Sequence, residues 1–189
     1  SDNHAYGNGG GVYAVSGQQS YGQVEGVDID GNVAEESGGG IYAKASYASL
    51  SMHGGWDPET GDPSRRSLSE NRARNGFGGG IYLEGSQIEN RFERIDARAN
   101  VSHEDGGALY ASGSAAGGDS STSLDTSVAE SSFEKNEAGG SGGAVYAARS
   151  GEAEGAWSSF AATSVRFSEN AARAGSGGAV YLGKNVNNL

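Results

Sequence analysis

Cysteine is absent from this chain of 189 residues, which excludes a disulfide framework and any metal site built from thiolates. Basic residues are also scarce: 13 Lys and Arg stand against 24 Asp and Glu, for a net charge of −11. Proteins that bind nucleic acids usually present a basic stripe, so this charge argues against a nucleic-acid partner. The sequence lacks any run of 18 apolar residues, and we therefore predict no transmembrane segment.

Proline occurs only twice, whereas glycine occurs 34 times and recurs in one pattern. The pattern is two glycines, a small residue, an aliphatic residue and a tyrosine. Its six copies are GGGVY at 9–13, GGGIY at 38–42, GGGIY at 78–82, GGALY at 106–110, GGAVY at 142–146 and GGAVY at 177–181. Glycines placed periodically beside aliphatic residues indicate a repeat with a buried core rather than disorder.

An asparagine precedes each motif tyrosine by 10 or 11 residues, whereas successive motif tyrosines are 28 to 40 residues apart. One half of the unit therefore has a fixed length and the other half absorbs insertions, which is typical of a solenoid. We predict one β-helical repeat domain over residues 1–189. Its units are anchored at Asn3/Tyr13, Asn32/Tyr42, Asn71/Tyr82, Asn100/Tyr110, Asn136/Tyr146 and Asn170/Tyr181.

The segments upstream of the asparagines are rich in Ser, Thr and short aliphatic runs, which favours strands, and none shows a helical period. A large apolar residue usually stands three positions before the asparagine: Ile29, Leu68, Phe133 and Phe167, with Ala97 as the exception. The period of two in a strand turns the motif aliphatic inward, the tyrosine outward and the next apolar residue inward. These patterns predict an all-β fold of about six parallel rungs with variable loop insertions.

Each column of the repeat then has a structural role. The glycine pair is expected to form a tight corner that needs a positive φ or a close backbone approach. The tyrosines form a column on neighbouring rungs. The asparagines are expected to form a ladder of hydrogen-bonded amides and to adopt the left-handed conformation of a corner themselves.

Two segments carry a resemblance to a known family. FEKNEAGGSGGAVY at 133–146 and FSENAARAGSGGAVY at 167–181 pair an FxxN motif with a GGA[ILV] motif. This pairing resembles the repeats of the chlamydial-type polymorphic outer membrane proteins. The resemblance implies a right-handed parallel β-helix like that of an autotransporter passenger, an extracellular or cell-surface location, and in many cases an adhesive role.

We expect a non-catalytic structural or adhesive protein. Both ends of the chain fall at nearly the same phase of the repeat without an evident cap. The chain is therefore expected either to be a module that continues into neighbouring modules of a longer surface protein or to stack end to end into a fibre. The alternative is a carbohydrate-binding or polysaccharide-degrading β-helix. No catalytic residues are predicted, because the three histidines fall at different phases of the repeat and the column before the asparagines is mixed in charge.

Two groups of residues are candidates for binding a partner such as a host surface or a glycan. The outward tyrosines are the first group: Tyr13, Tyr42, Tyr82, Tyr110, Tyr146 and Tyr181. The insertion at 52–67 is the second, with Trp56, Arg65 and Arg66 as anchors. Asp28 and Asp30 in VDIDGN are weak candidates for a metal site. No cofactor is expected, although the acidic surface is compatible with loose calcium binding.

Overall fold

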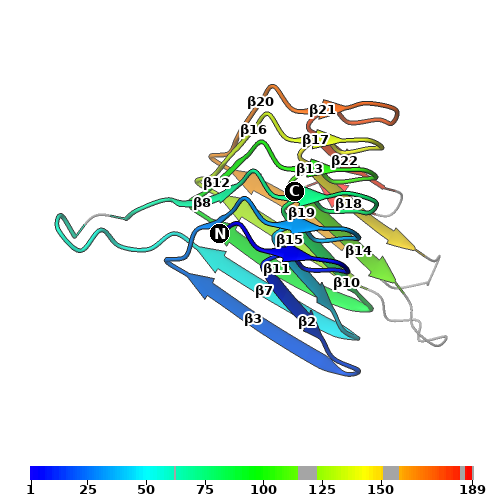
Figure 1. Ribbon diagram of the computed structural model, residues 1–189, viewed down its shortest axis with the longest axis horizontal. Helices are drawn as coiled ribbons and strands as arrows, with labels where there is room; N and C mark the ends of the chain where they lie inside the picture. Colours follow the sequence, from blue (N-terminus) through cyan, green and yellow to red (C-terminus); the bar gives the residue numbers. More distant parts are fainter. Residues whose placement is uncertain (62, 115–122, 151–157, 184–185, 189) are drawn as a thin grey trace.

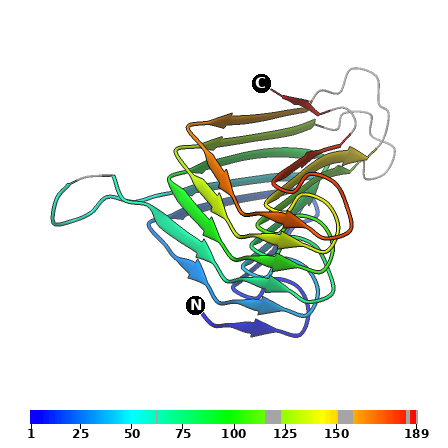
Figure 2. The same ribbon diagram turned by 90° about the horizontal axis from the view of Figure 1, so that it is seen from above.

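The computed structural model describes residues 1–61, 63–114, 123–150, 158–183 and 186–188, and its regular elements in these ranges are all strands. The chain winds in successive coils, each lying on the one before, from the N-terminus at one end of the stack toward the C-terminus at the other (Figure 2). Four parallel sheets, which we call A to D, run along this stack.

Sheets A and B are the first two sheets that each coil passes through. Sheet A has two-residue strands: β1 (His4–Ala5), β5 (Val33–Ala34), β9 (Arg72–Ala73), β13 (Val101–Ser102), β17 (Glu137–Ala138) and β21 (Ala171–Ala172). Sheet B contains the glycine motifs' aliphatic and tyrosine residues: β2 (Val12–Val15), β6 (Ile41–Lys44), β10 (Ile81–Gly85), β14 (Leu109–Ser114), β18 (Val145–Ser150) and β22 (Val180–Leu182).

Sheets C and D complete each coil. Sheet C has the longest strands: β3 (Gln19–Glu25), β7 (Tyr47–His53), β11 (Gln87–Glu93), β15 (Ser123–Ala129), β19 (Ser158–Thr163) and the short β23 (Asn187–Asn188). Sheet D consists of β4 (Ile29–Asp30), β8 (Arg66–Ser69), β12 (Ile95–Arg98), β16 (Ser132–Glu134) and β20 (Arg166–Ser168).

The chain passes through the sheets in the order A, B, C, D and pairs in register with the same strand of the next coil. Tyr42, Tyr82 and Tyr110, for example, are register partners across three strands of sheet B. The architecture is a right-handed parallel β-helix of about six rungs, as predicted (Figure 1). In the described ranges no helix is long and apolar enough to cross a membrane.

The rigid half of the unit is the path from sheet D through A to B, and insertions lie on either side of sheet C. The largest described insertion leaves the coil between β7 and β8 and projects away from the body (Figure 1). We call residues 54–61 and 63–65 the arm. The expected division into a fixed and a variable half is therefore confirmed.

The core follows the predicted alternation. Ile41, Ile81 and Leu109 point inward and are at most 2% exposed, and Leu83 and Ala111, two positions after such a residue, are fully buried. The apolar residues three positions before the asparagines also lie in the core, including Ala97, which breaks the size pattern but is fully buried. Burial of apolar surface from all four sheets stabilises the coil.

The asparagine column forms the expected ladder of buried amides. Asn71 donates from its backbone N–H and its Nδ2 to Oδ1 of Asn100, at 3.1 and 3.0 Å. Its Nδ2 also donates to the backbone oxygen of Ile29 at 2.7 Å. Asn100 and Asn136 repeat all three bonds. Asn3 donates to Asn32 and Asn32 donates to Asn71 in the same way, while Asn170 accepts from Asn136 and donates its Nδ2 to the Phe133 carbonyl. Both polar atoms of the interior side chains are thereby satisfied, which removes the cost of burying them.

One expectation about this corner is wrong. The asparagines do not adopt the left-handed conformation. The residue before each asparagine adopts it instead: Asp2, Gly31, Glu70, Ala99, Lys135 and Glu169 have φ between 53° and 66°. The asparagine is needed for its amide, which must continue the ladder. The turn is thus displaced onto a neighbour whose side chain faces solvent or is small.

The glycine pair has the two roles predicted for it, one for each glycine. The first glycine of each motif, such as Gly106, has a positive φ of 70°. The second lies against the next rung: a Cβ on Gly107 would be 2.1 Å from the carbonyl oxygen of Gly143. That separation is far below any normal contact, so only glycine fits where successive backbones approach so closely.

Candidate binding surfaces

The six motif tyrosines form a continuous stack on the outer face of sheet B. Neighbouring ring centroids are 4.7 to 5.3 Å apart and the ring planes are within 12° of parallel. Phe77 packs on the rings of Tyr82 and Tyr110, and Tyr42 and Tyr82 are only 8% and 9% exposed. Stacked rings of this kind stabilise the rungs they join.

This geometry restricts how the tyrosines could bind a sugar, which stays a prediction. A sugar stacks on the face of an aromatic ring, and both faces of each interior ring are covered by the rings of adjacent rungs. Tyr13 at the first rung is 60% exposed and stacks on the ring of Tyr42. Burial raises the pKa of Tyr82 and of Tyr146, the latter to about 12, so these phenols stay protonated at neutral pH.

The arm is a built hairpin rather than an irregular loop. Trp56 and Pro63 form an antiparallel bridge, and Ser64 donates its backbone N–H to the carbonyl of Gly55 at 2.8 Å. At the turn, Asp57 Oδ1 accepts the backbone N–H of Glu59 at 2.8 Å, as an Asx turn requires. Trp56 is 62% exposed on this hairpin. The arm therefore presents a large aromatic side chain to solvent in a fixed setting.

Arg65 and Arg66 lie at the base of the arm and do not project with Trp56. Arg65 Nη2 donates to the carbonyl of Glu130 at 2.7 Å, and its Nη1 pairs with the Asp96 carboxylate. The Arg66 guanidinium packs beside the backbone of Gly55 and Gly26. Arg65 thus fastens the arm to the next two rungs. Binding by these three residues stays a prediction, and the geometry favours Trp56.

Asp28 and Asp30 accept hydrogen bonds from the next rung of sheet D. Asp28 Oδ1 accepts the backbone N–H of Ser67 at 2.8 Å, and Asp30 Oδ1 accepts the Ser69 N–H at 2.8 Å and the Ser67 hydroxyl at 2.7 Å. Within the described ranges, no three His, Asp or Glu side chains come together as a metal site would need. A calcium role for the two aspartates stays a prediction.

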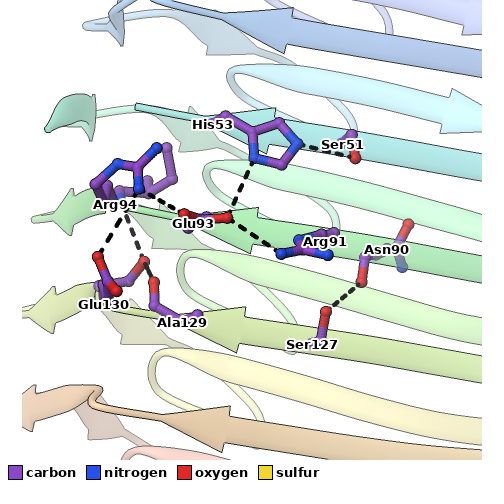
Figure 3. A network of polar contacts seen from close by, with 11 residues as sticks. Ser51, His53, Asn90, Arg91, Glu93, Arg94, Ser127, Ala129 and Glu130 are labelled. Carbon is purple, nitrogen blue, oxygen red and sulfur yellow. Dashed lines mark hydrogen bonds and ion pairs between the residues drawn. The ribbon is translucent and has the colours of Figure 1, made fainter. Parts of the chain in front are cut away.

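A network centred on Glu93 was not expected from the sequence. On the outer face of sheet C, Glu93 lies among His53, Arg91 and Arg94, with Glu130 beyond Arg94 (Figure 3). The Glu93 carboxylate is 2.5 Å from Nη1 of Arg94 and 3.3 Å from Nη2 of Arg91. His53 ends β7 and Glu93 ends β11, while Arg94 and Glu130 directly follow β11 and β15, so the register of the rungs brings these residues together.

Comparison with known families identifies the repeat. Three segments, 26–44, 130–148 and 164–183, match the family model of the Chlamydia polymorphic membrane protein repeat. These three segments are similar to the polymorphic membrane protein repeat. The resemblance of 133–146 and 167–181 to this family is confirmed, and it associates the chain with surface or outer-membrane proteins. No curated protein and no solved structure matches the chain significantly.

The three matched repeats cover the same part of the coil. Each begins at a residue with positive φ (Gly26, Glu130 or Ser164), then follows sheet D, the asparagine corner and sheet A, and ends at or near the end of the strand in sheet B. The two rungs between them, at Asn71 and Asn100, take the same path in register. The segments that resemble the polymorphic membrane protein repeat therefore correspond to the rigid half of the rung.

Proposed function

We propose that this chain is a non-catalytic β-helical part of an extracellular or outer-membrane surface protein, with a structural or adhesive role. The observation that carries the proposal is the match of three segments to the polymorphic membrane protein repeat, all on the rigid path through sheets D, A and B. Such a path builds a stiff support of stacked asparagines, glycines and tyrosines. A stiff support is what a surface protein needs to hold binding segments away from its membrane.

The arm supports the adhesive side of the proposal. It is internally hydrogen-bonded, fastened at its base through Arg65, and exposes Trp56 to solvent. Tryptophan is enriched among the residues that dominate binding energy at protein interfaces. The arm thus combines a large anchor residue with a preformed shape, which lowers the entropy lost on binding.

Other β-helical rungs are the second kind of partner that we propose. Parallel strands carry unpaired backbone groups at the edges of their sheets, and these groups can pair either with a neighbouring module of the same chain or with a second copy. Light scattering and electron microscopy on protein from its natural source decide between the two. Filaments would favour a second copy, and a short rod within a larger chain would favour a module.

A polysaccharide-degrading role has less support. It would need free carboxylates that converge on one outer face. On sheet C, Glu93 is engaged by two arginines, Glu89 accepts the Tyr47 hydroxyl at 3.0 Å, and Asp125 accepts the Ser159 hydroxyl. Incubating the protein with polysaccharides and measuring newly formed reducing ends tests this alternative directly, and steady release would establish it.

Surface labelling of intact cells tests the main proposal. Antibodies against the chain should label unpermeabilised cells of its natural source, and added protease should remove the signal. A cytoplasmic protein of the same cells, which should stay unlabelled and uncut, is the control. Labelling only after permeabilisation would overturn the proposed location.

A further inference from the structure

A cavity of about 150 Å³ lies on the outer face of sheet A. It is bordered by residues from four successive rungs, among them Arg72, His103, Glu137 and Arg173. One water molecule needs only about 15 Å³, so the cavity can hold a group much larger than water. None of these residues belongs to the repeated asparagines, glycine pairs and tyrosines or to the arm.

Register brings the lining residues together from distant parts of the chain. Arg72, Val101 and Glu137 are direct partners on β9, β13 and β17. Two residues further along each rung, the backbone pairing between rungs continues. The N–H groups of His103 and Arg173 donate to the carbonyls of Ala73 and Ala138 on the preceding rungs. Gly139 lies between His103 and Arg173 in this second column, where its backbone N–H donates to the carbonyl of Ser102 at 3.1 Å.

The cavity is basic although the whole chain is acidic. Three guanidinium groups, from Arg72, Arg74 and Arg173, border it together with a single carboxylate, that of Glu137. The chain as a whole has a net charge of −11. Three of its 13 basic residues are thus gathered at one hollow, where an anion would meet a locally favourable potential.

The guanidinium groups differ in their partners. Arg173 Nη2 donates to Glu137 Oε2 at 2.7 Å while its Nε pairs with Oε1, and Arg74 Nη1 is 2.8 Å from Glu35 on the far side. Arg72 makes no side-chain hydrogen bond or ion pair with another described residue, although it lies near enough to Glu137 to help Arg173 lower the pKa of that carboxyl. The Arg72 donors are therefore available to a ligand.

We propose that this cavity binds the sulfate or carboxylate group of an acidic polysaccharide, with Arg72 as the principal contact. Guanidinium groups form paired, charge-assisted hydrogen bonds with such groups. Nucleic acid fits less well, because nucleic-acid binders usually present an extended basic stripe, whereas the three arginines here gather at one hollow. The choice of an extracellular polymer as the source rests on the surface location proposed above.

The test measures binding of the full chain to a size-defined heparin oligosaccharide by isothermal titration calorimetry. Arg72→Gln should weaken binding about tenfold or more, the value of one charge-assisted hydrogen bond. Arg98→Gln is the matched control: Arg98 is exposed on sheet D, so the same loss of charge there should change affinity by less than about twofold. Val101→Phe should also weaken binding, because it fills the cavity without changing its charge.

The choice of polymer distinguishes the sources of the anion. Hyaluronan carries carboxylates alone, so binding of both polymers through Arg72 assigns a general anion site, and binding of heparin alone assigns a sulfate site. The proposal is overturned if neither polymer binds, if Arg98→Gln weakens binding as much as Arg72→Gln, or if a single-stranded oligodeoxynucleotide binds as tightly as heparin. None of these results would bear on the proposed surface location, because that proposal is tested separately by labelling intact cells.

Discussion

The side-chain oxygen of Asn136 accepts two hydrogen bonds from Asn100, one from the backbone N–H at 3.1 Å and one from Nδ2 at 2.9 Å. Each rung thus fixes the corner of the rung before it through a single buried amide. Asn100 and Asn136 are fully buried, so neither water nor any other group can replace the missing partner if one amide is removed. The ladder therefore couples neighbouring rungs more tightly than backbone pairing alone.

Asn100→Ala should lower the free energy of unfolding by about 3 kcal/mol or more, since it leaves buried groups on the preceding rung without partners. Asn71 loses the acceptor for two donors, and the carbonyl of Leu68 loses the Asn100 Nδ2 donor. Denaturant unfolding followed by circular dichroism measures the change. Asn75→Ala is the control, because Asn75 is exposed and donates only to the Glu35 carbonyl. Similar losses of unfolding free energy in the two variants would mean that the buried ladder contributes no more to stability than an exposed hydrogen bond.

Gly107→Ala should destabilise the coil by about 3 kcal/mol or prevent folding, although it adds only one methyl group. Its Cβ would lie 2.1 Å from the Gly143 carbonyl oxygen and 2.7 Å from the Glu137 nitrogen, and neither backbone atom can move without shifting a rung. Gly17→Ala adds the same methyl group where nothing lies within 4 Å. That control should keep or slightly raise the melting temperature. A folded Gly107→Ala protein that melts like the control would contradict the close-approach argument.

The repeat made the fold predictable because its signal recurs at fixed spacing. Val145, Tyr146 and Ala147 alternate in, out and in as a strand requires, and Asn136 stands ten residues before that tyrosine. The position of the turn was not predictable from residue type alone. Glu70, Lys135 and Glu169 have no intrinsic preference for a positive φ, and they adopt it because the adjacent asparagine must continue its ladder.

The cavity on sheet A was missed for a different reason. Arg72, Glu137 and Arg173 are far apart in the sequence and carry no motif of their own. A signal was nevertheless present: Arg72 and Glu137 each follow a ladder asparagine by one position, and Arg173 follows one by three. Aligning the rungs on the asparagines and examining the columns after them would have brought these charges together. The bonds of Arg65 at the arm's base could not be found in this way, because they depend on where an insertion folds back.

Alkaline pH should destabilise the fold through the tyrosine stack. Burial, followed by the charge of Tyr110, raises the pKa of Tyr146 to about 12 in the folded state, against an ordinary value of 10. A raised pKa means that the folded state prefers the protonated phenol. The stabilisation is therefore complete below pH 10 and is lost as the pH rises from 10 through 12.

Unfolding measured from pH 8 to pH 12 checks this expectation. Tyr146→Phe keeps the aromatic ring in the stack but has no phenol, so its stability should fall less steeply above pH 10 than that of the unmodified protein. Tyr6→Phe is the control, since Tyr6 is 89% exposed and lies outside the stack. An unchanged slope for Tyr146→Phe would show that its phenol does not contribute to alkaline unfolding.

Arg65 should control the order of the arm without controlling the stability of the coil. Arg65→Ala removes the pairing with Asp96 and the 2.7 Å hydrogen bond to the Glu130 carbonyl, both near the surface. Pairs this exposed contribute about 1 kcal/mol or less to global stability, so the melting temperature should change little. A hairpin released at its base opens more often, however, and limited proteolysis should cut the arm several times faster.

Two further variants complete this test. Arg166→Ala removes an exposed arginine from β20 of sheet D and should leave the cutting rate of the arm unchanged. Trp56→Ala should preserve both the melting temperature and the cutting rate, because the base of the arm stays fastened through Arg65. If the arm is the adhesive element, the Trp56→Ala protein should nevertheless lose binding to the partner surface, and it should be the only one of these variants to do so. Equal cutting of the Arg65→Ala and Arg166→Ala proteins would mean that the hairpin is held by its own hydrogen bonds rather than by the rungs beneath it.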